Sequence, residues 1–426
     1  MLISSIGSKG PLEEPKKWQF KILGKVEKLT AVSTLTPGPV VVTNGRIEVN
    51  PKSMSISGAQ VSMLDTKLIV SGNQDGYLVE GIQSMGFSFH GDVGPETTQW
   101  LSKIIDFPPK LRIQPPLHVS RARLGWNKKG NISLSGTLKK KDWPTVSIDM
   151  LAKPGELLIK KLTLQDEKSD ATINLNLKKG ELHLGFKGLL DKKTMDAILI
   201  ENKVLSGWIR GDFEAHILKE FPRHSTAEGT IQGEGVGNLS NLKVLLSIDE
   251  FSLEAIKREL EVKSASITMG ESHLNLKGKV GFSEEDFKFD MTVSANDLMW
   301  DEIEKTLKRE KEDSKHKEQT ESEFPPIRGT LRVKMESFKY ERITLRPLYA
   351  DILLDHDRIY VTVNEAGLCG ISAPGTIDIT PEGLSLEFNP VSKDQPVNPI
   401  INCLLDQEYR MTGDFDLKSR VAARGK

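Results

Sequence analysis

Two short motifs in this 426-residue chain have residue types that could bind a metal or a nucleotide. Asp355, His356 and Asp357 are consecutive metal-ligating side chains, but they stand between two alternating apolar segments, where a hairpin needs a solvated turn. Gly233, Gly235 and Gly237 have part of the spacing of a dinucleotide loop, yet no helix pattern follows them. We therefore predict a turn at 355–357 and strand or bulge glycines at 233–237.

The usual catalytic motifs are absent from the sequence. It contains no GxxxxGK(S/T) phosphate loop, no GxSxG nucleophile elbow and no HExxH zinc helix. The eight histidines are scattered singly, and neither cysteine has a histidine at ligand spacing. Carboxylates are spread through a chain that is 27% charged, so none marks an acid/base couple. We expect no catalytic residue, no metal and no cofactor, and hence no enzyme.

Charge and cysteine content narrow the range of partners. The 58 basic and 59 acidic residues give a net charge of -1, which offers no electrostatic case for nucleic acid. Cys369 and Cys403 could form one disulfide in an oxidising compartment, or remain as buried free thiols. No run approaches 18 apolar residues, so we expect no membrane-spanning helix. The compartment is either the cytoplasm or one reached through an anchoring or export segment outside this sequence.

Strict alternation of apolar and polar residues is the main structural pattern, and it is clearest at 171–188. Period-two alternation is typical of a strand with one buried face. With Lys179–Gly180 as a two-residue turn, one face of a hairpin carries three opposed apolar pairs. These pairs are Leu177 with Leu182, Leu175 with Leu184, and Ile173 with Phe186.

The same spacing predicts two more hairpins near the end of the chain. Ile352 and Leu354 would face Val361 and Ile359 across His356–Asp357. Ile377 and Ile379 would face Leu386 and Leu384 across Pro381–Glu382. Asn44–Gly45, the dipeptide most typical of a tight hairpin, predicts a further turn within 40–49.

We divide the chain into five segments by composition and pattern. They are an N-terminal β-rich segment (1–94), a short helix and proline-rich junction (95–116), a repetitive β-sheet region (117–299), a charged helix or linker (300–326) and a C-terminal β module (327–426). The predicted fold is mainly β, an elongated, repetitive, curled antiparallel sheet with few short helices. Its apolar faces form either an open groove or packed sheet layers.

Several segments resemble the AsmA-like family, which is related to the bridge-like envelope proteins TamB and YhdP. The most specific are Gly367–Leu368–Cys369–Gly370–Ile371, the stretch at 402–404, and 412–417. PETTQWL, IQPPLHVSRARLGW and SGWIRGDFEAHI resemble the middle region of the family. The resemblance implies a long sheet curled into an apolar groove, in a bacterial protein of the cell envelope involved in outer membrane biogenesis.

The function implied by this resemblance is non-enzymatic phospholipid transport between the inner and outer membranes. The partners would be phospholipid, an inner-membrane anchor or partner protein outside this sequence, and the outer membrane or its assembly proteins. A membrane-associated, periplasmic location would favour a Cys369–Cys403 disulfide. The groove candidates are Ile173, Leu175, Leu177, Leu182, Leu184, Phe186, Leu274, Leu276, Phe287, Phe289 and Met291. The alternative is a periplasmic structural or outer-membrane assembly factor built of closed β-sandwich modules.

Overall fold

The computed structural model confirms a mainly β chain with an open sheet. Strands make up 73% of the chain and helices 8%. The structure describes residues 2–425 apart from 12, 14–18, 35, 77–80, 105–111, 140–142, 238–245, 283–285, 302–326, 342 and 406–409. Most of the predicted charged linker at 300–326 therefore lies outside the described residues. No helix in the described ranges is long and apolar enough to cross a membrane.

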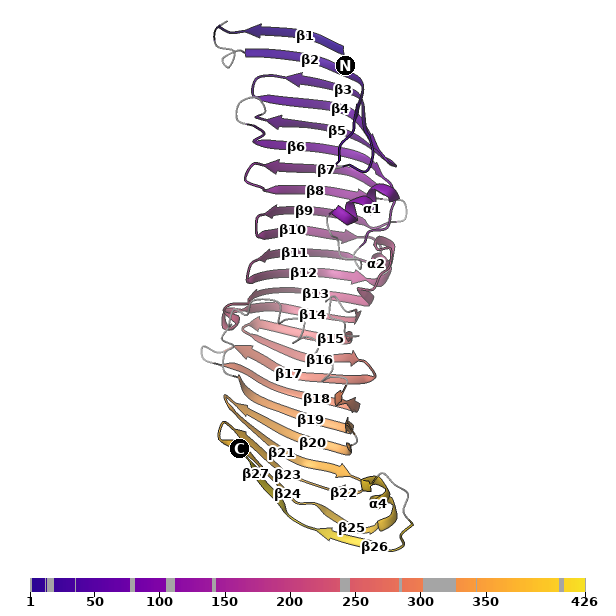
Figure 1. Cartoon of the computed structure of the whole chain (residues 1–426), viewed down its shortest axis with the longest axis vertical. Coiled ribbons are helices and arrows are strands. Elements are labelled where there is room, and N and C mark those ends of the chain that lie inside the picture. Colours follow the sequence, from indigo (N-terminus) through magenta and orange to yellow (C-terminus); the bar gives the residue numbers. More distant parts are fainter. Residues whose placement is uncertain are drawn as a thin grey trace. The chain divides into compact units, whose positions relative to one another are not determined.

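The chain divides into two compact units, Met1–Leu205 and Ser206–Lys426, and we describe each by itself. In unit 1 each strand pairs antiparallel with the next along the chain (Figure 1). Helix α1 (Pro95–Ile104) follows β6 and helix α2 (Lys192–Ile198) follows β12. The strands are β1 (Leu2–Lys9), β2 (Gln19–Ala31), β3 (Val40–Val49), β4 (Ser53–Met63), β5 (Thr66–Asp75), β6 (Ser84–Val93), β7 (Leu117–Asn127), β8 (Ile132–Lys139), β9 (Thr145–Lys153), β10 (Glu156–Gln165), β11 (Asp170–Lys178) and β12 (Glu181–Asp191).

In unit 2 the described pairings from β14 to β21 join strands that follow one another along the chain, antiparallel except for the parallel pair β18–β19. The chain between these two strands runs through residues outside the described ranges. Beyond β21 the pairing departs from chain order, with β23 beside β21, β25 beside β22 and β27 beside β24. The described helices of unit 2 are α4 (Val397–Leu405) and the short η3 (Pro222–His224). The strands are β13 (Leu205–Leu218), β14 (Thr226–Val236), β15 (Leu246–Lys257), β16 (Glu259–Met269), β17 (Ser272–Phe282), β18 (Phe287–Met299), β19 (Ile327–Tyr340), β20 (Ile343–Asp355), β21 (Arg358–Leu368), β22 (Ile371–Ser372), β23 (Gly375–Thr380), β24 (Gly383–Phe388), β25 (Val391–Pro396), β26 (Asp414–Lys418) and β27 (Val421–Gly425).

The registers of all three hairpins predicted from facing apolar residues are confirmed. Between β11 and β12, Leu177 lies opposite Leu182, Leu175 opposite Leu184, and Ile173 opposite Phe186. Gly180 in their turn has φ +76°, a conformation that side chains disfavour. The hairpins β20–β21 and β23–β24 have the predicted partners and turns as well. In these three hairpins, alternation together with a two-residue turn is therefore sufficient to fix the register.

The prediction of a hairpin turn at Asn44–Gly45 is wrong. Both residues lie inside β3, with Gly45 opposite Val26 of β2. Asn44 adopts φ +57°, which Asn tolerates better than most residues, but the strand does not reverse there. The reversal comes after Asn50, whose Oδ1 accepts hydrogen bonds from the backbone N–H groups of Lys52 (3.0 Å) and Ser53 (2.9 Å). Such an Asx turn satisfies the backbone as well as an Asn-Gly turn does.

Each unit is a single sheet layer with little enclosed core. The chain exposes 27969 Å², whereas two separate compact units of this total size would expose roughly 20,000 Å². Among the described residues, strands contact chiefly the strands to which they are hydrogen-bonded. The strands form one long sheet that is not closed into a barrel. The open form of the predicted fold, rather than packed layers, is the one observed.

Candidate functional site

In unit 1 the registers align apolar residues into rows that cross many strands on one face of the sheet. One row runs Val70, Phe89, Ala122, Gly136, Ile148, Leu162, Ile173 and Phe186. A second runs Phe87, Leu124, Leu134, Met150, Ile159, Leu175 and Leu184. Six of the groove candidates therefore belong to one apolar face, which extends well beyond their own hairpin.

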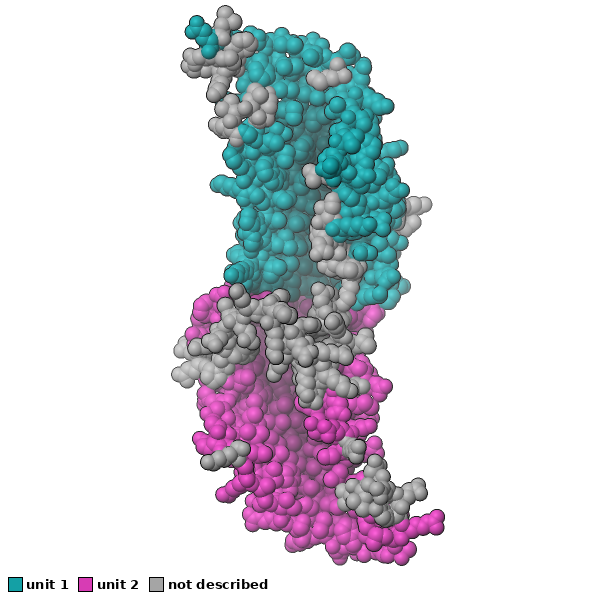
Figure 2. Space-filling view, viewed as in Figure 1, with its two compact units in different colours: residues 1–205 teal, residues 206–426 magenta. Residues whose placement is uncertain are grey.

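Burial on this face changes from one end of the strands to the other. Near the ends that carry α1 and α2, Val119 is 5% exposed and Leu164 is 6% exposed. Near the opposite, hairpin-turn ends, Ile132 is 44% exposed and Leu177 is 43% exposed. Figure 2 shows this face of unit 1 hollowed, with a ridge along the side where Figure 1 places the two helices. The helices therefore wall one side of an apolar groove and leave the other side open.

Asp65, in the turn between β4 and β5, holds the start of α1. Its carboxylate accepts hydrogen bonds from the N–H groups of Glu96 (2.7 Å) and Thr97 (3.1 Å) and from the Thr97 hydroxyl (2.9 Å). Burial raises the pKa of Asp65, but these hydrogen bonds outweigh it and leave the pKa below its usual value. A carboxylate at a helix N-terminus is also favoured by the helix dipole. The position of α1 thus depends on one charged side chain distant in sequence.

A buried polar network fixes α2 on the same side. Asp191 caps the helix by accepting from Lys193 N–H (2.8 Å), and the Thr194 hydroxyl donates to Asp166 (2.7 Å). Thr194 is fully buried. The chain after α2 then crosses to the segment that precedes β7. There Gln114 N–H donates to Ile198 O (2.7 Å), and Ile200 N–H donates to Arg112 O (2.9 Å). We call residues 112–116 and 198–200 the strap.

Unit 2 has its own apolar face, which carries the other five groove candidates. Leu276 lies opposite Val293, Val280 opposite Phe289, and Phe282 opposite Phe287 on β17 and β18. The face continues through β19 and β20, where Leu331 lies opposite both Met291 and Ile352. Leu274, Leu276, Phe287, Phe289 and Met291 are all half-buried. Leu274 also packs against the small core cluster of Ala295, Leu298 and Met335.

A disulfide joins Cys369, in the turn after β21, to Cys403 of α4, with the two Cα atoms 5.7 Å apart. Ile400 of the same helix is 4% exposed. Val397 N–H donates to Gly413 O (2.9 Å), and Met411 N–H donates to the Asn398 side chain (2.9 Å). The disulfide therefore holds α4 against the turn that joins β21 to β22, and the two hydrogen bonds hold the start of α4 against residues 411–413.

The opposite face of each sheet is polar and carries cross-strand ion pairs. Arg332 pairs with Asp290 (3.1 Å), Arg358 with Asp378 (2.8 Å), and Lys21 with Glu48 (2.8 Å). The hydrogen bond from Arg358 lowers the pKa of Asp378, which keeps that carboxylate ionised. Exposed pairs of this kind contribute at most about 1 kcal/mol each. Their main consequence is a well-hydrated outer surface on a sheet whose other face is apolar.

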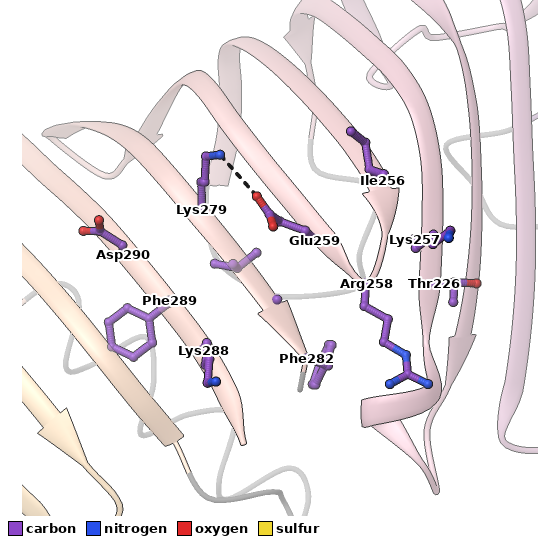
Figure 3. Close-up of a pocket in the computed structure, with 12 residues that line it drawn as sticks. Thr226, Ile256, Lys257, Arg258, Glu259, Lys279, Phe282, Lys288, Phe289 and Asp290 are labelled. Carbon is purple, nitrogen blue, oxygen red and sulfur yellow. Dashed lines mark ion pairs between the residues drawn. The ribbon is translucent and has the colours of Figure 1, made fainter. Parts of the chain in front are cut away.

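A surface cavity of about 780 Å³ lies near one end of β15–β18 in unit 2 (Figure 3). Lys279 of β17 pairs with Glu259 of β16 (3.2 Å), and the hydrogen bond raises the pKa of Lys279. Lys288 and Asp290 line the cavity from β18, on the face opposite to Phe289 in the strand alternation. The lining also includes Val280, Phe282 and Phe289 of the apolar face, so the cavity has both charged and apolar walls.

The two motifs considered for metal or nucleotide binding have structural roles, as predicted. His356 and Asp357 form the β20–β21 turn, and the Asp355 carboxylate bonds to Arg328 (3.0 Å) and His356 (2.9 Å). Gly233 and Gly235 lie inside β14. In the described part of the chain, one face of each unit can bury an apolar ligand, and the opposite face is polar and hydrated.

The residues that form the wall of the groove were not predicted from the sequence. Asp65 lies 31 residues from its partner Glu96, and no local pattern links them. The helix at Pro95–Ile104 was predicted, but its place over the apolar face was not. For α2, Asp191 is a residue type that commonly caps the start of a helix, and it is the one local signal for this helix in the sequence. The strap residues Arg112 and Ile200 carry no sequence pattern at all.

Comparison of the chain with protein-family models, with curated proteins and with solved structures finds no match in any of the three.

Proposed function

We propose that this protein is a non-enzymatic lipid-binding and lipid-transfer protein of the bacterial cell envelope, which shields phospholipid acyl chains on its apolar faces. The observation that carries the proposal is the alignment of apolar residues into uninterrupted rows that remain partly exposed. Leu184, the β12 member of the second row, is 38% exposed although six other strands contribute apolar residues to that row.

Acyl chains suit these faces in size and chemistry. β11 and β12 have 9 and 11 residues, which at about 3.3 Å per residue makes them roughly 30–36 Å long. This length exceeds the roughly 15 Å depth of one leaflet's hydrocarbon. Each methylene moved from water onto an apolar surface gains about 0.8 kcal/mol. A lipid chain on this face would therefore be stabilised without any specific polar contact.

The cellular setting is part of the same proposal. The Cys369–Cys403 disulfide supports an oxidising compartment such as the periplasm, since disulfides are rare in reducing compartments. Transfer between inner and outer membranes, with an inner-membrane anchor or partner protein and outer-membrane assembly proteins as contacts, follows from the AsmA-like resemblance. The alternative assembly factor with closed β-sandwich modules requires a second sheet layer, whereas the described strands form one long sheet.

Site-specific photo-cross-linking tests the proposal. A photoreactive amino acid replaces Leu276, on the apolar face of β17, or its neighbour Lys277, on the polar face. After incubation with phospholipid vesicles and illumination, we expect lipid adducts at position 276 and few at 277. Mass spectrometry of the purified protein should also find bound phospholipid. Equal labelling at the two positions, or no lipid in either measurement, would refute the function.

A further inference from the structure

The apolar face of unit 1 contains a cavity of about 590 Å³ between α1, the strap and the strands β6–β9. This volume lies within the roughly 300–1,000 Å³ typical of small-molecule sites. Val119, Leu138 and Ile148 form part of its floor, Ile113 of the strap lies along one side, and Thr98 and Ser102 of α1 line another. The cavity is thus a defined recess within the groove wall.

Two small residues give the cavity its depth. Ala122 and Gly136 are opposite neighbours in a row whose flanking members are Phe89 and Ile148. A Cβ added to Gly136 would lie 2.9 Å from Arg121 O and 3.0 Å from the Ala122 side chain, so the backbone itself excludes a larger residue there. The floor is therefore indented where the helix stands over it.

The lining contains two described charged side chains of opposite sign, Arg112 and Glu96. Both residues are exposed, and neither forms an ion pair with another residue in the part of the chain that the structure describes. Arg112 belongs to the strap and Glu96 to the first turn of α1. The remaining lining is apolar, apart from hydroxyl and amide groups such as those of Thr98 and Gln99.

We propose that this cavity seats one acyl chain of a zwitterionic phospholipid, whose phosphate contacts Arg112 and whose ammonium group contacts Glu96. The inference rests on the proposed function and adds a location and a headgroup class. An anionic headgroup would satisfy Arg112 but would be repelled by Glu96. An uncharged lipid would leave both charges without partners. A headgroup that carries both charges matches the pair.

The seat of the acyl chain is tested by filling the cavity. Ser102→Trp places an indole on the side of α1 that lines the recess, whereas Lys103→Trp places it on the next residue, outside the lining. The probe is phosphatidylcholine with a photoreactive diazirine in its acyl chain, and adducts are located by mass spectrometry of peptides. Exclusion of about two methylenes predicts roughly tenfold less adduct on peptides of β7–β9 for Ser102→Trp. Lys103→Trp should match the wild type.

The headgroup is tested by neutralising each charge. For exposed charge pairs worth up to about 1 kcal/mol, Arg112→Gln and Glu96→Gln should each lower the phosphatidylcholine adduct about two- to fivefold. With the phosphatidylglycerol counterpart of the probe, Arg112→Gln should lower the yield while Glu96→Gln should raise it. Arg123→Gln, on the polar face of β7, is the matched control and should change neither yield.

Each other outcome overturns a stated part of the proposal. If Ser102→Trp leaves the β7–β9 adducts unchanged, the cavity is not the acyl-chain seat. If Glu96→Gln leaves phosphatidylcholine labelling unchanged or higher, the site does not select a zwitterionic headgroup. Either result can occur while lipid still labels position 276 of unit 2, in which case the proposed function stands. Absence of adducts on both apolar faces would instead refute the proposed function itself.

Discussion

Two apolar residues on the same face of one strand can differ in role: a buried one belongs to the core, and a partly exposed one lines the groove. Phe186 is 9% exposed and Leu184 is 38% exposed, although both lie on the apolar face of β12. The sequence predicts that the two share a face, because alternation and the turn fix their register. It gives no information about exposure, since this depends on α2 and on where the helical wall ends. Apolar type and spacing are the same for a core residue and a wall residue.

This difference in exposure predicts that replacing these two β12 side chains by alanine lowers the free energy of unfolding by unequal amounts. Phe186→Ala should lower the free energy of unfolding by about 3 kcal/mol or more, because it removes a ring from a buried position. Leu184→Ala should cost about 1 kcal/mol or less, because much of its side chain already contacts water. Chemical denaturation followed by circular dichroism measures both. A similar large loss for the two variants would show that Leu184 is core rather than wall.

At the scale of elements, alternation predicts the strands well, but it does not predict which segments pack over their apolar face. The hairpins at 171–188, 352–361 and 377–386 follow from local pattern alone. Asn44–Gly45 misleads because positive φ at Asn44 serves inside a strand, while the reversal uses the Asn50 side chain. The wall depends on contacts between distant residues, such as Asp166 with Thr194 and Asp65 with Thr97. Single-sequence reasoning has no means to pair these residues.

The attachment of α1 should depend on pH through Asp65. Because hydrogen bonds lower the pKa of Asp65 in the folded state, the ionised carboxylate stabilises the attachment of α1 at any pH above the pKa of the unfolded chain, about 4. This contribution is lost as pH falls through the lowered folded value. We expect the fluorescence of Trp100, measured as the difference from a Trp100→Phe variant, to shift to the red in that range as the half-buried indole is released.

Asp65→Ala provides the comparison for this titration. It should shift the Trp100 spectrum already at neutral pH and cost about 1 kcal/mol, the usual value of a helix cap. The variant should then show no further change on acidification. A red shift at low pH that persists in Asp65→Ala would assign the pH dependence to another group.

At the scale of the molecule, each unit is stabilised mainly between neighbouring strands, as in other repetitive folds. The excess of exposed area over that of compact units means that much apolar surface finds no partner within the described chain. A large exposed apolar surface on a soluble protein usually marks a site of interaction. Stability and ligand binding are then linked, because whatever covers the faces adds the burial that the single layer lacks.

Phospholipid should therefore stabilise the whole protein, and it should do so through its acyl chains. A ligand that binds the folded state alone adds about 2.7 kcal/mol to the free energy of unfolding at a hundred times its Kd. We expect urea midpoints to rise with short-chain phosphatidylcholine below its micelle concentration. Glycerophosphocholine, which has the same headgroup and no acyl chains, should produce little change because the stabilisation comes from apolar burial. Equal stabilisation by the two compounds would contradict an apolar site, since the headgroup alone would then account for binding.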